Sequence, residues 1–340
     1  MTVQNQSLSG CGLWCSAVRH AITLLLLSGC ASIAISAAKP KQPSAAQTEL
    51  AKQANDAFWA ALHAGAYEQI PDVKEQLQRA YLTDPNDAAT AAHLGFLHIW
   101  AISERSRLPK LEASITDHML LSQRYFTEAV EMTHDPRFEG FLAITELANG
   151  TIHKDERLLR TGYFRLEKAV DDYPEFNLFS RGFTRSSFPV DHEFFKKGLE
   201  DMWKNIDVCL DATIDRANPD YTKYMAAQTT EGVKRVCWNG WIAPHNHEGF
   251  ALNLGDMLVK AGDVKAARVM YANAKLSKTF DRWPYRDVLE RRIAEADENV
   301  EHFRKKADEQ PEGHRMMIAS EFSCSGCHAD DQRGGGGDSR

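Results

Sequence analysis

The chain has 340 residues, of which 43% are hydrophobic and 26% are charged, and its formal net charge is −7. This length and apolar content are sufficient for a substantial core in one or two domains. The acidic balance argues against a nucleic-acid partner, because binding to a polyanion is driven by clustered Lys and Arg side chains.

Residues 1–29 have the pattern of an export signal. Arg19 and His20 precede an apolar run that ends in Leu27-Ser28-Gly29-Cys30, and a short apolar run behind a basic residue is typical of secretory signals. The ending resembles the lipobox of bacterial lipoproteins, which implies that Cys30 is acylated and that the lipid attaches the chain to a membrane. An uncleaved anchor is the alternative, since residues 21–38 carry no charge and are barely long enough to span a bilayer.

The residues after Cys30 extend this interpretation. Ala31 stands where an aspartate would resemble the signal that retains lipoproteins in the inner membrane. The resemblance therefore favours the outer membrane of a bacterial cell envelope, with the chain facing the periplasm. Residues 30–48 are small and polar and include Pro40 and Pro43, so we expect them to form a flexible tether.

Residues 49–308 show helical rather than strand periodicity, which predicts an all-α domain. In three places an alanine within a predicted helix is followed by a proline a few residues later, at 79–85, 128–136 and 168–174. Each proline should end its helix, because it cannot continue the ladder of backbone hydrogen bonds. Recurrent punctuation of this kind is typical of stacked helical hairpins.

The clearest hairpin is predicted at residues 246–283. Gly255 and Ala274 would let its two helices approach closely, and Gly262-Asp263 would form the turn between them. Further positions of the tetratricopeptide pattern are filled by Gly249, Ala251, Leu254, Leu258, Ala266, Ala267, Tyr271 and Pro284. The chain thus resembles tetratricopeptide-repeat proteins, which implies a right-handed solenoid of degenerate hairpins, with further units at 88–101 and 141–169. Such solenoids commonly dock partner proteins on a concave face.

Three other stretches do not follow the repeat. Residues 177–189 lack a clean period and are predicted to be an ordered loop, whereas residues 191–213 are predicted to form an amphipathic helix. From Pro284 to Phe303, apolar residues recur at three- and four-residue steps. This spacing predicts one charged helix that caps the array.

Cys11 and Cys15 would be lost with the export signal, Cys30 would carry the lipid, and two further cysteines belong to the C-terminal motif described below. Cys209 and Cys237 remain, as an even pair outside the cytosol, where disulfides persist. A disulfide and two separately buried thiols are both consistent with the sequence, because spacing along the chain does not give a distance in space.

The segment Pro244–Glu248 contains two histidines beside a carboxylate and is a candidate metal or haem-edge site. We favour a helix start instead, with Asn246 as the N-cap and Glu248 in the first turn. Residues at i and i+2 do not share a helical face, so the two histidines would diverge. The tryptophans near this hairpin, at positions 238, 241 and 283, are expected to build the core rather than to stack on a porphyrin.

Residues 309–340 form a C-terminal extension with the most specific motif of the chain, Cys324-Ser325-Gly326-Cys327-His328. C-x-x-C-H is the attachment site of c-type haem. The two thiols form thioethers with the porphyrin and the histidine is the proximal iron ligand. The motif therefore predicts one covalent haem c at Cys324 and Cys327, ligated by His328. The glycines at 334–337 close a tail that is predicted to be disordered.

The sequence does not determine the second axial ligand of the iron. Met316 or Met317 would raise the reduction potential, whereas His314 would lower it. Core packing is the competing role for both methionines, and the iron site could instead be five-coordinate. Only 12 residues follow the motif, too few for the usual monohaem cytochrome c domain. The late motif in a helical chain resembles the class that includes cytochrome c′.

Other uses of the motif are a zinc or copper site and a redox dithiol. Zinc would need a fourth ligand, and the chain has no second C-x-x-C. Nucleophile elbows, phosphate loops and HExxH motifs are also missing from the sequence, so hydrolase and nucleotide-enzyme functions have no support.

Together these features predict an exported, lipid-tethered helical protein that carries one haem. We expect electron transfer or redox partnering with another protein rather than catalysis, with the repeats as the docking surface. The alternative is a non-redox scaffold lipoprotein whose tail binds a metal or nothing. A haem peroxidase or a gas-binding protein would require an open iron position.

Overall fold

The computed structural model describes residues 36–37 and 39–331. The export signal, Cys30 and the glycine-rich tail lie outside the described residues. Within those residues the regular structure consists of α-helices and short 3-10 helices without a strand, which confirms the all-α prediction. No helix in this part of the chain is both long and apolar enough to span a bilayer. Residues up to Gln42 form a separate unit, and the helices named below all follow it.

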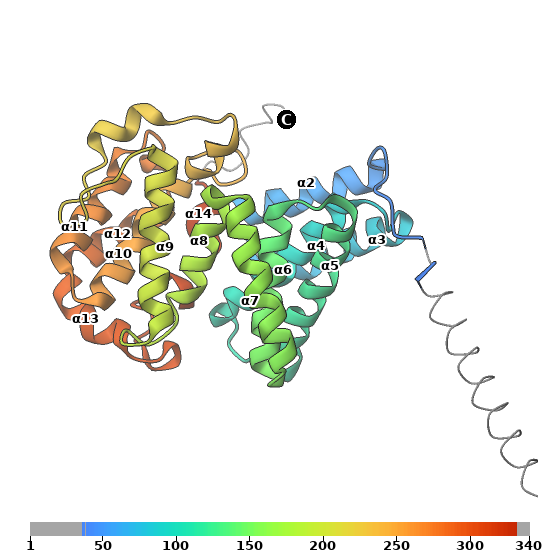
Figure 1. The fold of residues 1–340 in the computed structure, drawn as a ribbon, viewed down its shortest axis with the longest axis horizontal. Coiled ribbons are helices and arrows are strands. Elements are labelled where there is room, and N and C mark those ends of the chain that lie inside the picture. The colour runs from blue at the N-terminus through green and yellow to red at the C-terminus, as the bar shows by residue number, and fades with distance from the viewer. Residues whose placement is uncertain (1–35, 38, 332–340) are drawn as a thin grey trace, which may run out of the picture. The chain divides into compact units, whose positions relative to one another are not determined.

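The helices from α2 to α11 pack in sequence-adjacent pairs (Figure 1). The pairs are α2 (Glu49–His63) with α3 (Ile70–Thr83), α4 (Ala88–Ser103) with α5 (Asp117–Thr133), α6 (Pro136–His153) with α7 (Glu156–Asp172), α8 (Pro174–Arg185) with α9 (Glu193–Leu210), and α10 (Asn246–Ala261) with α11 (Val264–Asn273). The predicted helix at 191–213 is thus confirmed as α9. The insertion between α4 and α5 contains the 3-10 helices η2 (Arg105–Arg107) and η3 (Ala113–Thr116).

The proline punctuation marks helix ends as predicted. Pro136 is the first residue of α6 and Pro174 the first residue of α8, and the preceding helices end just before them. Proline suits a first helical position because the backbone N–H there has no partner within the helix. Asp135 adds a cap, since its side chain accepts a hydrogen bond from Arg137 N at 2.9 Å.

The hairpin of α10 and α11 is built as its small residues predict. Gly262 adopts φ +92° between the two helices, and the Asp263 side chain caps α11 by accepting from Ala266 N at 3.2 Å. A Cβ on Gly255 would collide with the ring of Tyr271. Glycine at this position therefore sets the distance between the two helices.

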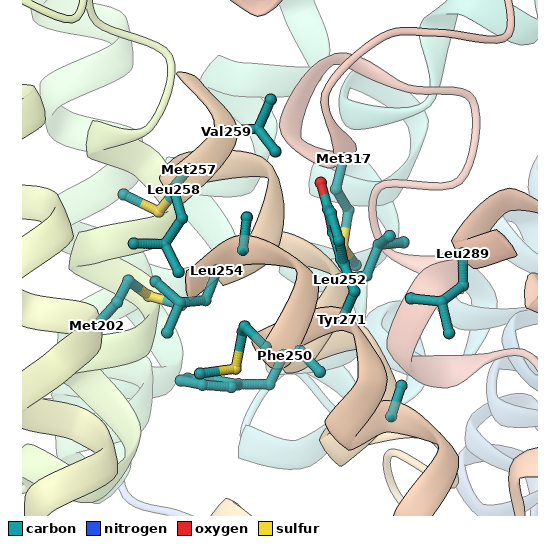
Figure 2. Packing of buried hydrophobic residues seen from close by; sticks show 14 of the residues in the cluster. Met202, Phe250, Leu252, Leu254, Met257, Leu258, Val259, Tyr271, Leu289 and Met317 are labelled. Carbon is teal, nitrogen blue, oxygen red and sulfur yellow. The ribbon is translucent and has the colours of Figure 1, made fainter. Parts of the chain in front are cut away.

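Helix α10 is the centre of the largest core cluster, and nearly its whole length is buried. Figure 2 shows its apolar side chains pointing to both sides, toward Met202 of α9 on one side and toward Tyr271, Leu289 and Met317 on the other. A helix that is buried along nearly its whole length, including polar residues such as Asp256 and Lys260, is enclosed by other elements. Anything that packs on α10 is therefore part of the core.

Residues 177–189 are not a loop, and this prediction is wrong. Helix α8 covers them to Arg185. Arg181 and Arg185 interrupt the apolar periodicity, but both face inward and bind the buried carboxylate of Asp201 on α9, at 2.7 and 2.8 Å. Because the charges are paired across the hairpin, they occupy positions that sequence periodicity assigns to apolar residues.

The predicted single helix at 284–303 is two helices, α12 (Arg286–Ala294) and α13 (Ala296–Arg304), which corrects that prediction. Glu295 lies at the break with φ −97° and ψ 16°. The break lets Leu289 of α12 and Phe303 of α13 both enter the core around α10. One straight helix would follow a single direction, whereas the two segments pack on α11 and α10 in turn.

The C-terminal extension folds back onto the helical domain. After η8 (Ala307–Glu309), η9 (Met317–Ala319) packs on α10, and α14 (Ser325–His328) contacts both α10 and α2. The extension therefore connects the last hairpin with the first. The remaining 3-10 helices are η1 (Tyr67–Gln69), η4 (Thr222–Ala227), η5 (Val233–Cys237), η6 (Ala274–Leu276) and η7 (Phe280–Arg282).

Candidate functional site at the C-x-x-C-H motif

The motif residues form a short helical turn. Cys324 has helical dihedral angles as the N-cap of α14, which runs from Ser325 to His328. Residues at i, i+3 and i+4 share a helical face, so Cys324, Cys327 and His328 lie on one side of the turn. Haem attachment requires these three side chains to act on the same porphyrin. The backbone spacing allows this, while Cys327 packs in the α10 cluster and Cys324 against the α2–α4 cluster.

A buried carboxylate from α4 holds the start of this turn. Oε1 of Glu104 accepts hydrogen bonds from Cys324 N at 2.9 Å, from Ser325 N at 2.7 Å and from Ser325 Oγ at 2.8 Å. Its Oε2 accepts from Trp100 Nε1 at 3.0 Å. Glu104 is completely buried, and a negative charge beside the first N–H groups of a helix is favourable.

Arg107 completes the environment of Glu104. Its Nη2 lies 3.0 Å from Glu104 Oε2, and its Nη1 donates to the Gly65 carbonyl at 3.1 Å. Burial raises the pKa of Glu104, while Arg107 and the hydrogen bonds from Ser325 and Trp100 oppose that shift. The carboxylate thus joins three elements that are far apart in sequence, the end of α2, α4 and the motif.

Helix α10 closes the other side of the motif. A Cβ on Gly249 would collide with Sγ of Cys327, so only glycine allows α10 to approach this closely. His245 N donates to the Cys327 carbonyl at 3.0 Å, and Trp283 Nε1 donates to the Gly326 carbonyl at 2.8 Å. The backbone of the motif is therefore satisfied by groups from the last hairpin.

His328 has the protonation geometry of a metal-binding imidazole. Its Nδ1 lies 2.7 Å from the Ile242 carbonyl oxygen, and because a carbonyl only accepts, Nδ1 must carry the hydrogen. The lone pair is then on Nε2, the nitrogen that remains for an iron ligand. Burial lowers the pKa of His328 to about 4, which keeps the ring neutral at physiological pH.

Trp59 lies beside His328, and the rings of His63 and Trp241 contact Trp59. The Trp59 ring centroid lies 6.4 Å from that of His328 and 5.2 Å from that of Trp241. The His63 ring is 5.4 Å from Trp241, and its Nε2 approaches the same Ile242 carbonyl at 3.4 Å. We call Trp59, His63, Trp241 and Ile242 the aromatic patch. Trp241 is 59% exposed, so the prediction that it belongs to the core is wrong, whereas Trp238 and Trp283 are buried as predicted.

The two motif thiols are free and enclosed. Cys327 is buried and Cys324 is half-buried. Burial raises the pKa of both thiols, that of Cys327 to about 12. A reactive dithiol needs thiolates stabilised near neutral pH, so the environment argues against a redox-dithiol function.

The three candidates for a second axial ligand have different surroundings. Met317 packs against Gly326, on the side of α14 away from the shared Cys-His face. Met316 is buried in the α10 core. His314 pairs with Glu295 through an Nδ1–Oε2 contact of 3.0 Å. Only Met317 is therefore placed next to the motif, and there it fills core space.

The segment at 244–248 begins α10, with His245 as the N-cap, one residue before the predicted Asn246. His245 Nδ1 lies 3.0 Å from Glu248 Oε1, and both side chains are fully buried. The other oxygen of Glu248 accepts from Asn239 Nδ2 at 2.7 Å. A polar network thus runs from behind the motif to a cavity of about 490 Å³ lined in part by Trp238 and Asn239.

The structure bonds Cys209 to Cys237, with a Cα–Cα distance of 5.9 Å. The bond ties the end of α9 to η5, just before the segment that carries Trp241 and Ile242. It therefore shortens the free length of the chain that leads to the aromatic patch.

Sequence reasoning missed Glu104, Arg107, Gly249 and the patch residues of α2. Glu104 lies 220 positions from Cys324, and nothing in the local pattern of α4 marks its partner. Gly249 was recognised as a repeat position, but its contact with Cys327 depends on how the extension folds back.

Comparisons with protein-family models, with curated proteins and with solved structures find no significant match to this chain. Across the described part of the chain, no three His, Cys, Asp or Glu side chains are grouped so that they could hold a metal ion.

Proposed function

We propose that this chain is an envelope-tethered c-type haem protein that exchanges electrons with a protein partner. Cys324 and Cys327 would hold the haem through thioethers, and His328 would ligate the iron through Nε2. The observation that carries the proposal is the neutral His328, with Nδ1 bound to Ile242, on the same face as both cysteines. When bound, haem supplies one-electron chemistry at its iron.

The enclosed thiols set a condition on attachment. Cys324 and Cys327 would hold the porphyrin through thioether bonds, and the addition of a thiol to a vinyl group would consume no oxidant. Cys327 is covered by Gly249 of α10. Attachment would therefore precede the docking of α14 between α10 and α2, while the C-terminal extension is still open.

The helical pairs would serve as the docking scaffold. Sequence-adjacent packing from α2 to α11 supports a right-handed solenoid of tetratricopeptide-like hairpins, whose concave face would receive the partner. Acylation at Cys30 would attach the chain to the outer membrane, facing the periplasm. This part of the proposal rests on the N-terminal sequence alone.

Haem attachment tests the proposal directly. The full chain would be produced with a cytochrome c maturation system, and its pyridine haemochrome spectrum would be recorded after denaturation. We expect a c-type spectrum, lost in Cys324→Ser/Cys327→Ser and retained in the matched control Cys209→Ser/Cys237→Ser. A wild-type chain without covalent haem would refute the proposal, as would equal haem loading in both double variants.

A scaffold without redox chemistry is the second candidate, because Cys327 is buried and Cys324 is half-buried, as structural residues are. Removing residues 324–340 would not separate the two functions, since it would also strip α14 from α10. Cys324→Ser/Cys327→Ser keeps the helix and removes the attachment chemistry. If that variant retained the cellular function of the chain, the scaffold would be favoured.

A further inference from the structure

The cavity beside Trp238 is lined mainly by uncharged polar groups. Its volume is about 490 Å³, which falls within the usual range of small-molecule pockets. One wall is the 228–239 segment that precedes α10, and the other is the 277–279 turn that follows η6. These walls contribute four hydroxyl groups, two amides, one carboxylate, one amine and one indole. The cavity is therefore suited to a ligand that forms many hydrogen bonds.

Burial separates the mouth of this cavity from its floor. Glu231 and Lys278 are exposed, so the two charged groups lie at the mouth, and their opposite signs leave no net charge there. Trp238 and Ser277 are buried, and with the half-buried Asn239 they form the floor. A ligand that enters the cavity therefore meets hydroxyl, amide and indole groups without an excess of either charge.

The buried Glu248 fixes the polar groups of the floor. Its Oε2 accepts a hydrogen bond from Asn239 Nδ2 at 2.7 Å, and its Oε1 accepts one from Thr279 Oγ1 at 2.8 Å. The amide oxygen of Asn239 in turn accepts from His247 N at 2.7 Å. Both side chains are thus held in place by α10. Polar groups that are ordered in advance lose little conformational freedom when a ligand binds, which favours affinity.

The outer wall of the cavity is anchored, although residues 228–239 contain no α-helix. Gly232 has φ +64°, in the left-handed region that glycine adopts readily, and it turns the chain just beyond the mouth. Tyr173 Oη then donates to the Val233 carbonyl at 2.6 Å. The Cys209–Cys237 bond ties the end of the wall to α9. These three features restrain the wall, so the cavity is a defined part of the fold.

Trp238 provides a hydrogen-bond donor that the surrounding protein leaves unpaired. Its buried Nε1 has no acceptor within the part of the chain that the structure describes. A buried donor without a partner is unfavourable, so an acceptor oxygen brought by a ligand would stabilise the site.

The lining argues against two other classes of small molecule. A phosphorylated ligand needs several cations or clustered N–H donors, whereas Lys278 is the single cation of the described lining and Glu231 opposes it. An apolar ligand would remove water from the floor without replacing its hydrogen bonds. A neutral polyhydroxylated molecule meets neither difficulty, because every hydroxyl group both donates and accepts.

We propose that this cavity binds a neutral saccharide, with sugar hydroxyl groups bound at the floor and the Trp238 indole as the aromatic contact. The inference goes beyond electron transfer and does not depend on haem, because no lining residue belongs to the C-x-x-C-H motif.

Isothermal titration calorimetry with the full wild-type chain tests the inference. The neutral probes are glucose, N-acetylglucosamine and maltose, and the charged comparators are glucose 6-phosphate and glycine. We expect at least one neutral probe to bind at one site per chain. Neither comparator should bind more tightly than that probe, because the lining lacks the cluster of cations that a phosphate requires.

Thr230→Arg obstructs the cavity with a long side chain. Thr230 is exposed at the mouth, so the substitution should leave the core intact. It should weaken saccharide binding about tenfold, because a pocket ligand needs most of its surface enclosed. Thr151→Arg on α6, where the threonine is also exposed, is the matched control and should leave the affinity unchanged. Circular dichroism checks that both variants fold.

Three results would overturn the inference. The first is that none of the neutral probes binds at millimolar concentration. The second is that glucose 6-phosphate or glycine binds more tightly than every neutral probe, which would assign the cavity to a charged ligand. The third is that Thr230→Arg and Thr151→Arg have the same affinity. Each of these results leaves the proposed haem function intact, since the haemochrome spectrum decides that function separately.

Discussion

Two buried carboxylates illustrate how differently this chain uses charge. Asp201 in the α8–α9 hairpin binds Arg181 and Arg185 and joins neighbours at most 20 positions apart in sequence. Glu104 instead accepts hydrogen bonds from Trp100, Cys324 and Ser325, and so connects α4 with a motif 220 positions away. Asp201 stabilises a local pair of helices, whereas Glu104 fixes the geometry of the candidate site.

The largest expected effects come from removing these carboxylates. Glu104→Ala leaves the N–H groups of Cys324 and Ser325 without their acceptor and breaks the pair with Arg107, so it should lower the free energy of unfolding by about 3–5 kcal/mol. Asp201→Ala should cost less, because Glu167 still pairs with Arg181 and Arg185 at 2.8 and 3.3 Å. Chemical denaturation of the haem-free protein measures this loss. Glu104→Gln keeps the side-chain oxygen that accepts from Cys324 and Ser325, so its loss should be smaller.

The two variants should differ at the motif thiols. With Glu104 removed, the start of α14 is no longer held, and Cys324 and Cys327 should react faster with a thiol reagent under native conditions. Asp201→Ala should leave their labelling rate near that of the wild type. Residue-resolved mass spectrometry measures both rates, and equal acceleration in the two variants would mean that Glu104 has no special role at the motif.

Gly249 offers a smaller and more specific perturbation. Gly249→Ala forces a methyl group against Sγ of Cys327, and overpacking of this kind costs about 1–3 kcal/mol of folding stability. Cys327→Ala removes the sulfur, so the double variant should recover part of the loss. Strictly additive effects in this double-mutant cycle would show that the two residues do not interact.

The sequence was sufficient for the parts of the fold that depend on neighbouring residues. The helices before Pro136 and Pro174 end where predicted, and Gly262-Asp263 forms the predicted turn. Errors arose where tertiary pairing overrides periodicity. Arg181 is buried against Asp201, so the helix it belongs to does not show an uninterrupted apolar stripe.

For the candidate site, the sequence predicted the chemical groups but not their surroundings. The motif spacing alone brings Cys324, Cys327 and His328 to one face. Glu104 and Trp59 reach the motif only because the extension returns to α4 and α2, and no local pattern encodes that return. The same folding places Trp241 at the surface, although a tryptophan beside a core helix is normally expected inside.

The smallest expected effect concerns the charge state of His328. Burial lowers its pKa in the folded chain to about 4, whereas the unfolded chain has the ordinary value of about 6.5. Between these pH values the unfolded chain binds the proton and the folded chain does not, so protonation favours unfolding and stability falls as the pH drops.

In haem-free protein, His328→Phe removes this contribution. Because His328 is only half-buried, the stability difference between variant and wild type should shift by about 1 kcal/mol between pH 7 and pH 5, in favour of the variant. Urea denaturation at the two pH values measures the shift. The buried His98, whose pKa is lowered to about 3, gives a matched comparison in His98→Phe, since its environment lies away from the motif. One outcome is that the two variants respond alike in haem-free protein while only His328→Phe changes the haem spectrum of loaded protein. That result would mean that burial keeps both rings neutral and that only His328 ligates the iron.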